Sequence, residues 1–270
     1  MSAIRNVFRS RGKDGVLIAY AMGGDPDLET SEKVVEALVK GGADIVELGI
    51  PFSDPIADGK SIQAAAVRSL SAGTRPADVL GIVSRIKKKH SVPIAIMTYY
   101  NVLYSPGLDR FLAEAKNAGV DGLIIPDLPL DETGEYSKLA KRYALDTILL
   151  AAPTTTPGRM KDLVRHSTGF LYLVSLLGVT GARSQLGDGT LKLVKSAGRA
   201  TRGKIPLGVG FGISKPEHVR AVLDAGADAA IVGSSIVNMV ASGEPREEML
   251  KGIEAYVRSL KAATRRPNQT

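Results

Sequence analysis

The stretch Gly42-Ala43-Asp44-Ile45-Val46 (GADIV) decides the fold, because its pattern returns twice along the chain. Gly119–Leu123 (GVDGL) and Gly226–Ala230 (GADAA) repeat it with small changes. Each copy is typical of a helix that ends at a glycine, followed by a tight turn into a buried strand. Glycine suits this position because, without a Cβ, it adopts the left-handed conformation without a steric penalty. The three copies predict one repeated helix–strand architecture along the chain, without a linker.

Eight short apolar runs are the expected strands of this repeat. They are almost continuously hydrophobic, which is typical of parallel strands covered on both faces. Amphipathic segments such as Thr30–Lys40 and Glu247–Lys261 lie between them. This alternation favours an α/β fold of the (β/α)8 TIM-barrel type over a doubly wound sheet. The runs are Val16–Met22, Ile45–Ile50, Pro93–Tyr99, Gly122–Asp127, Thr147–Ala152, Phe170–Ser175, Leu207–Gly212 and Ala229–Val232.

The length of 270 residues fits this architecture. A prior of about 150 residues per domain allows two domains, but α/β barrels of about 250 residues are commonly single domains. We therefore predict a single-domain TIM barrel over residues 1–270, with an N-terminal helix before the first strand.

The composition excludes several classes of site and partner. The absence of cysteine excludes a disulfide framework, a zinc–thiolate or iron–sulfur centre and a thiol nucleophile, and three histidines argue against a histidine-rich metal site. The net charge of +7 lies in residues 1–15 and 255–270, so residues 16–254 are neutral. We expect solvated basic ends and no nucleic-acid partner. With neither a secretion signal nor a membrane-spanning segment in the sequence, no membrane association and a cytoplasmic location are expected.

The second run contains Glu47, a carboxylate inside an otherwise apolar strand. One explanation is a surface-facing or ion-paired side chain. An unpaired carboxylate in an apolar site, however, costs several kcal/mol, and burial raises its pKa toward neutrality, which suits proton transfer. Active sites of TIM barrels lie at the C-terminal ends of the strands. Asp54 and Asp58 follow in the next loop, where each is as typical of a turn as of a site.

The seventh run ends in a glycine-rich stretch, Gly208–Ser214 (GVGFGIS), and the eighth ends in Val232–Ser235 (VGSS). Glycine lets backbone N–H groups approach a phosphate, and loops after strands seven and eight hold phosphate in many barrels. The spacing does not complete the dinucleotide fingerprint, because Ile213 stands where its last glycine belongs. The two loops favour phosphate binding over simple tight turns.

The segment Glu47–Asp58 (ELGIPFSDPIAD), with Gly23–Pro26, Gly178–Gly181 and Gly212–Ser214, resembles the tryptophan synthase alpha subunit family over essentially the whole chain. The resemblance implies a lyase of L-tryptophan biosynthesis that cleaves indole-3-glycerol phosphate to indole and glyceraldehyde 3-phosphate. It also implies a beta subunit that uses pyridoxal phosphate to join indole to serine, in an alpha2-beta2 heterotetramer. The alpha subunit itself is expected to need no cofactor and no metal.

The resemblance also implies roles for individual residues. Glu47 matches the group that transfers protons at indole C3, Asp58 the carboxylate at the indole N–H, and Tyr172 the active-site tyrosine. Thr180 matches a threonine on the loop after the sixth strand, whose closure would order Asp58. The positions that match the phosphate site are Gly181, Gly212, Gly233 and Ser234, and those around the indole pocket or its rim are Tyr20, Ile62, Met97, Tyr99 and Asp127.

Two carboxylates suit this reaction. Indole becomes a good leaving group when C3 is protonated, and a carboxylate at N1–H stabilises the resulting cation. A glutamic acid of raised pKa can move the protons, and no lysine or Schiff base is needed. The chain departs from the family pattern at Leu176, where many members carry arginine, at Lys60, where proline is common, and at Tyr20, where phenylalanine is common. These departures concern loop closure and coupling to the partner.

Two other functions remain possible from the residues. Another phosphate-binding barrel of the tryptophan or histidine pathways, related to indole-glycerol-phosphate synthase, would rely on lysines inside its strands, and none of the eight runs contains a lysine. A non-catalytic or weakly active subunit that regulates a beta partner would be expected to lack Glu47 or Asp58, and both are present.

Overall fold

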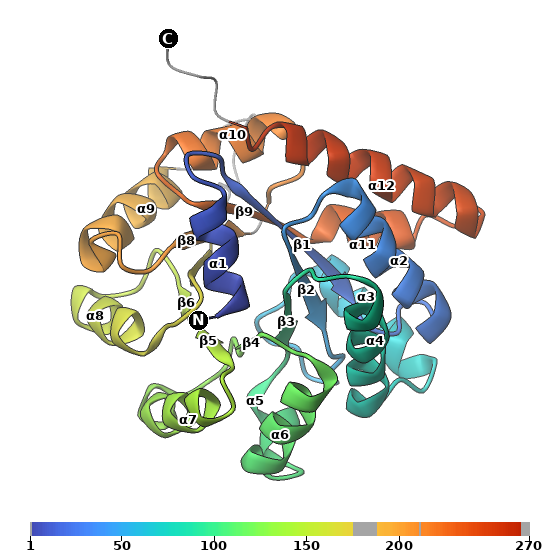
Figure 1. Cartoon of the computed structure of the whole chain (residues 1–270), viewed down its shortest axis with the longest axis horizontal. Helices are drawn as coiled ribbons and strands as arrows, with labels where there is room; N and C mark the ends of the chain where they lie inside the picture. The colour runs from blue at the N-terminus through green and yellow to red at the C-terminus, as the bar shows by residue number, and fades with distance from the viewer. Residues whose placement is uncertain (1, 175–187, 211, 266–270) are drawn as a thin grey trace.

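The computed structural model describes residues 2–174, 188–210 and 212–265. All its paired strands are parallel and form one sheet in the order β5-β4-β3-β2-β1-β9-β8-β7-β6, with the helices arranged around it (Figure 1). The strands are β1 (Val16–Met22), β2 (Ile45–Gly49), β3 (Ile94–Met97), β4 (Gly122–Ile124), β5 (Asp146–Ile148), β6 (Leu150–Ala151), β7 (Leu171–Val174), β8 (Leu207–Gly210) and β9 (Ala229–Val232).

The fifth predicted strand closes the barrel as two short segments. β5 pairs with β4, and β6 pairs with β7. Between the segments the carbonyl of Leu149 accepts a hydrogen bond from the N–H of Tyr172 at 2.9 Å, so the backbone ladder continues across the break. The predicted TIM barrel is confirmed, and because of this break the described residues form nine strand segments in place of eight.

Side chains along the strands alternate between the barrel interior and the surrounding helices. In β2, Ile45 belongs to the interior cluster, whereas Val46 and Leu48 belong to the cluster beneath the helices. All three are fully buried. This double burial is the reason that the strands are apolar at almost every position.

Helices follow the strands around the barrel. α2 begins behind Asp27, whose carboxylate accepts the N–H of Thr30 at 2.8 Å, and it ends at Gly42. The helices are α1 (Ala3–Ser10), α2 (Leu28–Gly41), α3 (Lys60–Ser71), α4 (Pro76–Lys89), α5 (Tyr100–Tyr104), α6 (Leu108–Ala118), α7 (Leu130–Arg142), α8 (Pro157–His166), α9 (Asp188–Thr201), α10 (Pro216–Asp224), α11 (Ser234–Val240) and α12 (Arg246–Ala262). No helix in the described residues has the length and apolar character to cross a bilayer.

The predicted N-terminal helix, α1, lies over the centre of the barrel in Figure 1. Its Ile4 is fully buried and belongs to the interior cluster. Its Phe8 ring lies 5.9 Å, centroid to centroid, from the ring of Phe170, which precedes β7. α1 therefore covers the end of the barrel at which the strands begin, and leaves the opposite end for a site.

The three repeated junctions have one geometry. Gly42, Gly119 and Gly226 have φ values of 98°, 95° and 104°, which only glycine adopts readily. The aspartate two residues after each glycine binds the start of another strand: the carboxylates of Asp44, Asp121 and Asp228 accept the N–H groups of Leu17, Ile94 and Leu207, each at 2.8 Å. Each copy of the repeat thus ends a helix with its glycine and binds the start of a neighbouring strand with its aspartate.

The expectation of solvated basic ends is wrong for two residues, whereas Arg9, Lys13, Arg258 and Arg265 are exposed. Arg11 and Lys261 both pair with Asp44, whose side chain is fully buried, and the Lys261–Asp44 distance is 2.6 Å. Thr264 is also fully buried, and its carbonyl accepts the N–H of Gly15 at 2.9 Å. These charges neutralise a buried carboxylate and join the two ends of the described chain.

Candidate active site

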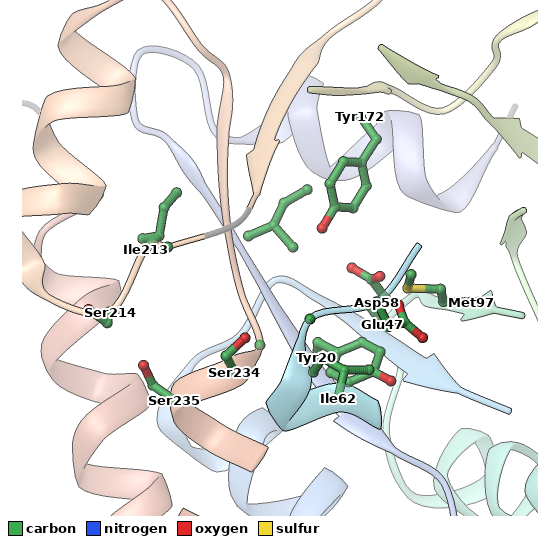
Figure 2. A pocket seen from close by; sticks show the side chains of 14 residues that line it. Tyr20, Glu47, Asp58, Ile62, Met97, Tyr172, Ile213, Ser214, Ser234 and Ser235 are labelled. Carbon is green, nitrogen blue, oxygen red and sulfur yellow. The ribbon is translucent and has the colours of Figure 1, made fainter. Parts of the chain in front are cut away.

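A cavity of about 180 Å³ lies at the C-terminal ends of the strands. Glu47 and Asp58 share it with the ring of Tyr172 on one side, and Ser214, Ser234 and Ser235 lie on the other (Figure 2). Nine of the predicted site residues line it: Tyr20, Glu47, Asp58, Ile62, Met97, Tyr172, Gly212, Gly233 and Ser234. The remaining lining residues are Gly59, Ile213, Ser214, Ile231 and Ser235.

Glu47 is positioned by β2, where it lies in register with Tyr20 of β1 and Ala95 of β3. Its side chain is 1% exposed, and its Oε2 has no hydrogen-bond partner among the described residues. Burial, followed by the negative charge of Asp58, raises the pKa of Glu47 to about 8. At neutral pH Glu47 therefore carries a proton and faces a cavity with it.

Asp58 lies in the loop that precedes α3. A turn between the Asp58 N–H and the Pro55 carbonyl, 3.1 Å apart, shapes this loop, and the Gln63 side chain donates to the Asp58 carbonyl at 2.8 Å. Burial raises the pKa of Asp58 to about 6, and a hydrogen bond from Tyr99 opposes the increase. Asp58 is therefore mostly ionised at neutral pH, in the same cavity that holds a protonated Glu47.

Tyr99 attaches this loop to the end of β3. Its hydroxyl accepts the N–H of Ala57 at 3.0 Å and donates to the Asp58 carboxylate. Its ring stacks on Phe52, with centroids 5.2 Å apart and an angle of 24° between the ring planes. Tyr99 does not line the cavity, so its contact with the site is through the loop that carries Asp58.

The rings of Tyr20 and Tyr172 need glycines beside them. A Cβ on Gly49 would lie 2.3 Å from the Tyr20 hydroxyl, and a Cβ on Gly210 would lie 2.4 Å from the Tyr172 hydroxyl. Burial, together with the charges of Glu47 and Asp58, raises the pKa of both tyrosines, so both hydroxyls remain protonated. Part of the glycine-rich run after the seventh predicted strand therefore makes room for an aromatic ring.

The opposite end of the cavity carries the predicted phosphate residues. Gly212 has a φ of 75°, and Gly233 is the residue before α11, whose first two residues are Ser234 and Ser235. A Cβ on Gly233 would lie 3.2 Å from the Cβ of Tyr20, closer than ordinary van der Waals contact. The end of the cavity distant from the carboxylates is therefore bordered by backbone, by small hydroxyl side chains and by Ile213.

Some predicted residues lie elsewhere. The carboxylate of Asp127 accepts the N–H of Tyr100 at 2.8 Å and holds the first turn of α5, away from the cavity lining. Gly181 and Thr180, together with Leu176, fall outside the described residues. Lys60 is the exposed first residue of α3.

Five lining residues were not predicted individually, although three of them, Ile213, Ser214 and Ser235, lie in the two predicted phosphate loops. Ser214 and Ser235 each lie within two residues of a predicted phosphate residue, and their hydroxyls were the available signal. Ile231 gave no signal, because the sequence of a continuously apolar strand does not show which of its side chains face the barrel interior. Among the described residues, no group of three His, Cys, Asp or Glu side chains is arranged to hold a metal ion.

Comparison with known proteins identifies the family. The family model described as tryptophan synthase alpha chain matches residues 8–265. The chain belongs to the tryptophan synthase alpha chain family. It is 45% identical to the tryptophan synthase alpha chain of Methanoregula boonei over 265 residues, 97% of this chain and 98% of that one. It is 44% identical to the chain of that name from Arabidopsis thaliana, over 94% of this chain and 92% of that one.

Solved structures agree with the tryptophan synthase alpha assignment. The tryptophan synthase A-subunit from Pyrococcus furiosus has a TM-score of 0.86 and 40% identity, and the match covers 92% of this chain and 98% of that chain. The predicted family, the lyase class and the place in tryptophan biosynthesis are confirmed by these comparisons. They do not favour a silent regulatory subunit or another barrel of the tryptophan or histidine pathways.

Proposed function

We propose that this chain cleaves indole-3-glycerol phosphate to indole and glyceraldehyde 3-phosphate by a retro-aldol reaction. The observation that carries the proposal is a pair of carboxyl groups in one cavity, with pKa values raised to about 8 for Glu47 and about 6 for Asp58. Between these values one group is protonated and the other ionised. The reaction requires both states at once.

Glu47 would transfer the protons. The protonated carboxyl donates to C3 of the indole ring, which converts the ring into a leaving group. The resulting carboxylate then takes the proton from the glycerol hydroxyl next to C3 as the carbon–carbon bond breaks and the aldehyde forms. Glu47 ends in its starting state, so the cycle neither gains nor loses a proton.

Asp58 would stabilise the cation that protonation creates. Protonation at C3 places a positive charge on the ring, with much of it at N1–H, and an ionised carboxylate accepting that N–H lowers the energy of this species. Tyr99 favours the required state, because its hydrogen bond lowers the pKa of Asp58. Tyr172 offers a protonated hydroxyl to the same cavity.

The substrate phosphate would occupy the other end of the cavity. Gly212, Gly233 and Ser234 border it there, and their backbone can approach an anion closely because two of the three lack a Cβ. Gly181 and Thr180 belong to the proposal by family resemblance. A phosphate held at this end directs the indole ring toward the two carboxylates.

The proposal includes a partner. The name of the family indicates a beta subunit. We propose that this partner consumes the indole and that the two chains form an alpha2-beta2 heterotetramer in the cytoplasm. The two carboxyl groups supply the proton transfers and the charge stabilisation, so we assign no cofactor to this chain and leave pyridoxal phosphate to the beta subunit. Light scattering on the mixed subunits measures the stoichiometry.

The test is indole release from indole-3-glycerol phosphate, measured from pH 5 to 9, with and without a beta subunit. The expected kcat/KM profile is bell-shaped, with limbs near pH 6 and pH 8, because activity needs ionised Asp58 and protonated Glu47. Faster release with the beta subunit supports the complex. If no indole forms in either condition, although the beta subunit is active on added indole, the chain is a silent subunit.

A further inference from the structure

The proposed phosphate end is made by two loops from different strands. Gly212–Ser214 follows β8, and Gly233–Ser235 follows β9. Among the described residues, β8 and β9 pair at Gly208–Ala229 and Val209–Ala230. Farther along, Gly210 pairs with β7 and Val232 pairs with β1. In the described part of the chain, the ladder between the two strands therefore stops short of Gly212 and Gly233.

Tyr256 of α12 connects the two loops from outside the cavity. Its hydroxyl donates to the carbonyl of Ser214 at 2.9 Å, and the side chain of Ser235 lies close enough to the same oxygen to oppose the rise that burial causes in the pKa of Tyr256. A phenolic hydroxyl has one proton to donate and lone pairs to accept, so it can interact with both loops at once. α12 contacts both α10 and α11, the helices that follow the two loops.

Ser214 is held on both of its backbone groups. Its carbonyl accepts from Tyr256, and its N–H donates to Nδ1 of His218, in the first turn of α10, at 3.3 Å. Its side chain lines the cavity, whereas neither Tyr256 nor His218 does. Tyr256 and His218 thus hold the Gly212–Ser214 loop in place from outside the cavity.

We propose that Tyr256 is a positioning residue that holds the two phosphate-binding loops at the separation that a phosphate group requires. This inference rests on the proposed function, because it needs the phosphate of the substrate at this end of the cavity. Glu47 and Asp58 lie on β2 and the loop before α3, whereas the Tyr256 hydroxyl donates its hydrogen bond to the loop after β8. Loss of the hydroxyl is therefore expected to weaken phosphate binding and to leave the proton-transfer steps intact.

The variant is Tyr256→Phe in the full chain, which removes one oxygen and keeps the ring that packs against the core. The matched control is Tyr104→Phe, because Tyr104 is 67% exposed. For Tyr256→Phe we expect the inhibition constant of glycerol phosphate and the KM for indole-3-glycerol phosphate to rise about fivefold to tenfold, the effect of one lost hydrogen bond. We expect kcat to stay within about twofold, and the affinity for free indole to stay unchanged.

Thermal unfolding with and without glycerol phosphate gives a second measurement that does not need turnover. The ligand should raise the midpoint less in Tyr256→Phe than in the wild type and the control. An unchanged inhibition constant overturns the proposal, and so does a fall in kcat alone. Gly233→Val separates this failure from failure of the proposed function. If it abolishes glycerol phosphate binding while Tyr256→Phe does not alter it, only the positioning role is wrong. If glycerol phosphate does not bind the wild type, the phosphate site itself is wrong.

Discussion

Glu47→Gln tests the central assignment, because it removes the titratable proton and keeps the size of the side chain. General acid–base catalysis contributes about 10² to 10⁴ in rate, so kcat should fall at least about a hundredfold, equal to about 2.7 kcal/mol of transition-state stabilisation. The KM should change little, because the phosphate residues lie at the other end of the cavity. Both kinetic constants come from the indole-release assay.

The same substitution has a pH-dependent effect on stability. The pKa of Glu47 rises from 4.5 to about 8 on folding, so the contribution of Glu47 to stability is fully present below pH 4.5 and is lost as the pH rises toward 8. At pH 7 the unfolded state is ionised and the folded state is protonated. This difference of about 2.5 pH units costs about 3 kcal/mol, and the cost approaches about 5 kcal/mol above pH 8. Glutamine does not titrate and escapes the loss.

The measurement is the denaturant midpoint of both proteins at pH 5, 7 and 8.5, on the preparations used for kcat. We expect Glu47→Gln to gain stability relative to the wild type as the pH increases. The control is Glu244→Gln, an exposed glutamate in the loop between α11 and α12, which should change neither quantity. A structural ion pair would behave in the opposite way, since breaking a buried one costs about 3–5 kcal/mol. Near-normal turnover with a large drop in midpoint would refute the catalytic role of Glu47.

Three further substitutions test the rest of the site. Asp58→Asn should lower kcat by about 10² to 10³ and remove the acidic limb near pH 6. It should also move the alkaline limb below pH 8, because the Asp58 charge raises the pKa of Glu47. A pH–rate profile with both limbs in place contradicts this prediction. Tyr99→Phe should move the acidic limb above pH 6, since it removes a hydrogen bond that lowers the pKa of Asp58; a pH profile identical to that of the Tyr104→Phe control would assign Tyr99 to the fold alone. Gly233→Val should raise the KM at least about tenfold and abolish thermal protection by glycerol phosphate, because its side chain would press on Tyr20; intact protection moves the phosphate elsewhere.

The fold was predictable because its signals are local. The glycine and aspartate of each junction lie within three residues of the strand that they precede, and each has a defined role in the structure, since Gly42 adopts a left-handed φ and Asp44 caps a strand. Helix ends were predictable within about two residues for the same reason, as for α12 behind Pro245. The break of the fifth strand at Leu149 was not predictable, because the run through it is uniformly apolar.

Contacts between segments that are distant in the chain could not be predicted from the sequence. Gly208 and Gly210 stand in a run that suggested phosphate binding, yet a Cβ on Gly210 would collide with Tyr172, and one on Gly208 would lie 3.0 Å from the Phe170 ring. Arg11 and Lys261 counted as solvated charge until the fold placed both beside Asp44. The sequence shows which residue types are present and how far apart they stand along the chain. Only the folded barrel shows which of them lie together in space.

The roles of the two carboxyl groups follow from their depth in the barrel. Glu47 stands within a strand, enclosed by β1 and β3, and lacks a hydrogen-bond donor at Oε2 among the described residues, so it retains its proton. Asp58 stands on a loop beside the Tyr99 hydroxyl, which favours its ionised form. The negative charge of Asp58 then strengthens the hold of Glu47 on its proton. Each group thereby favours the state that the reaction needs in the other, and exchanging the two residues would place the charge at the position least able to carry it.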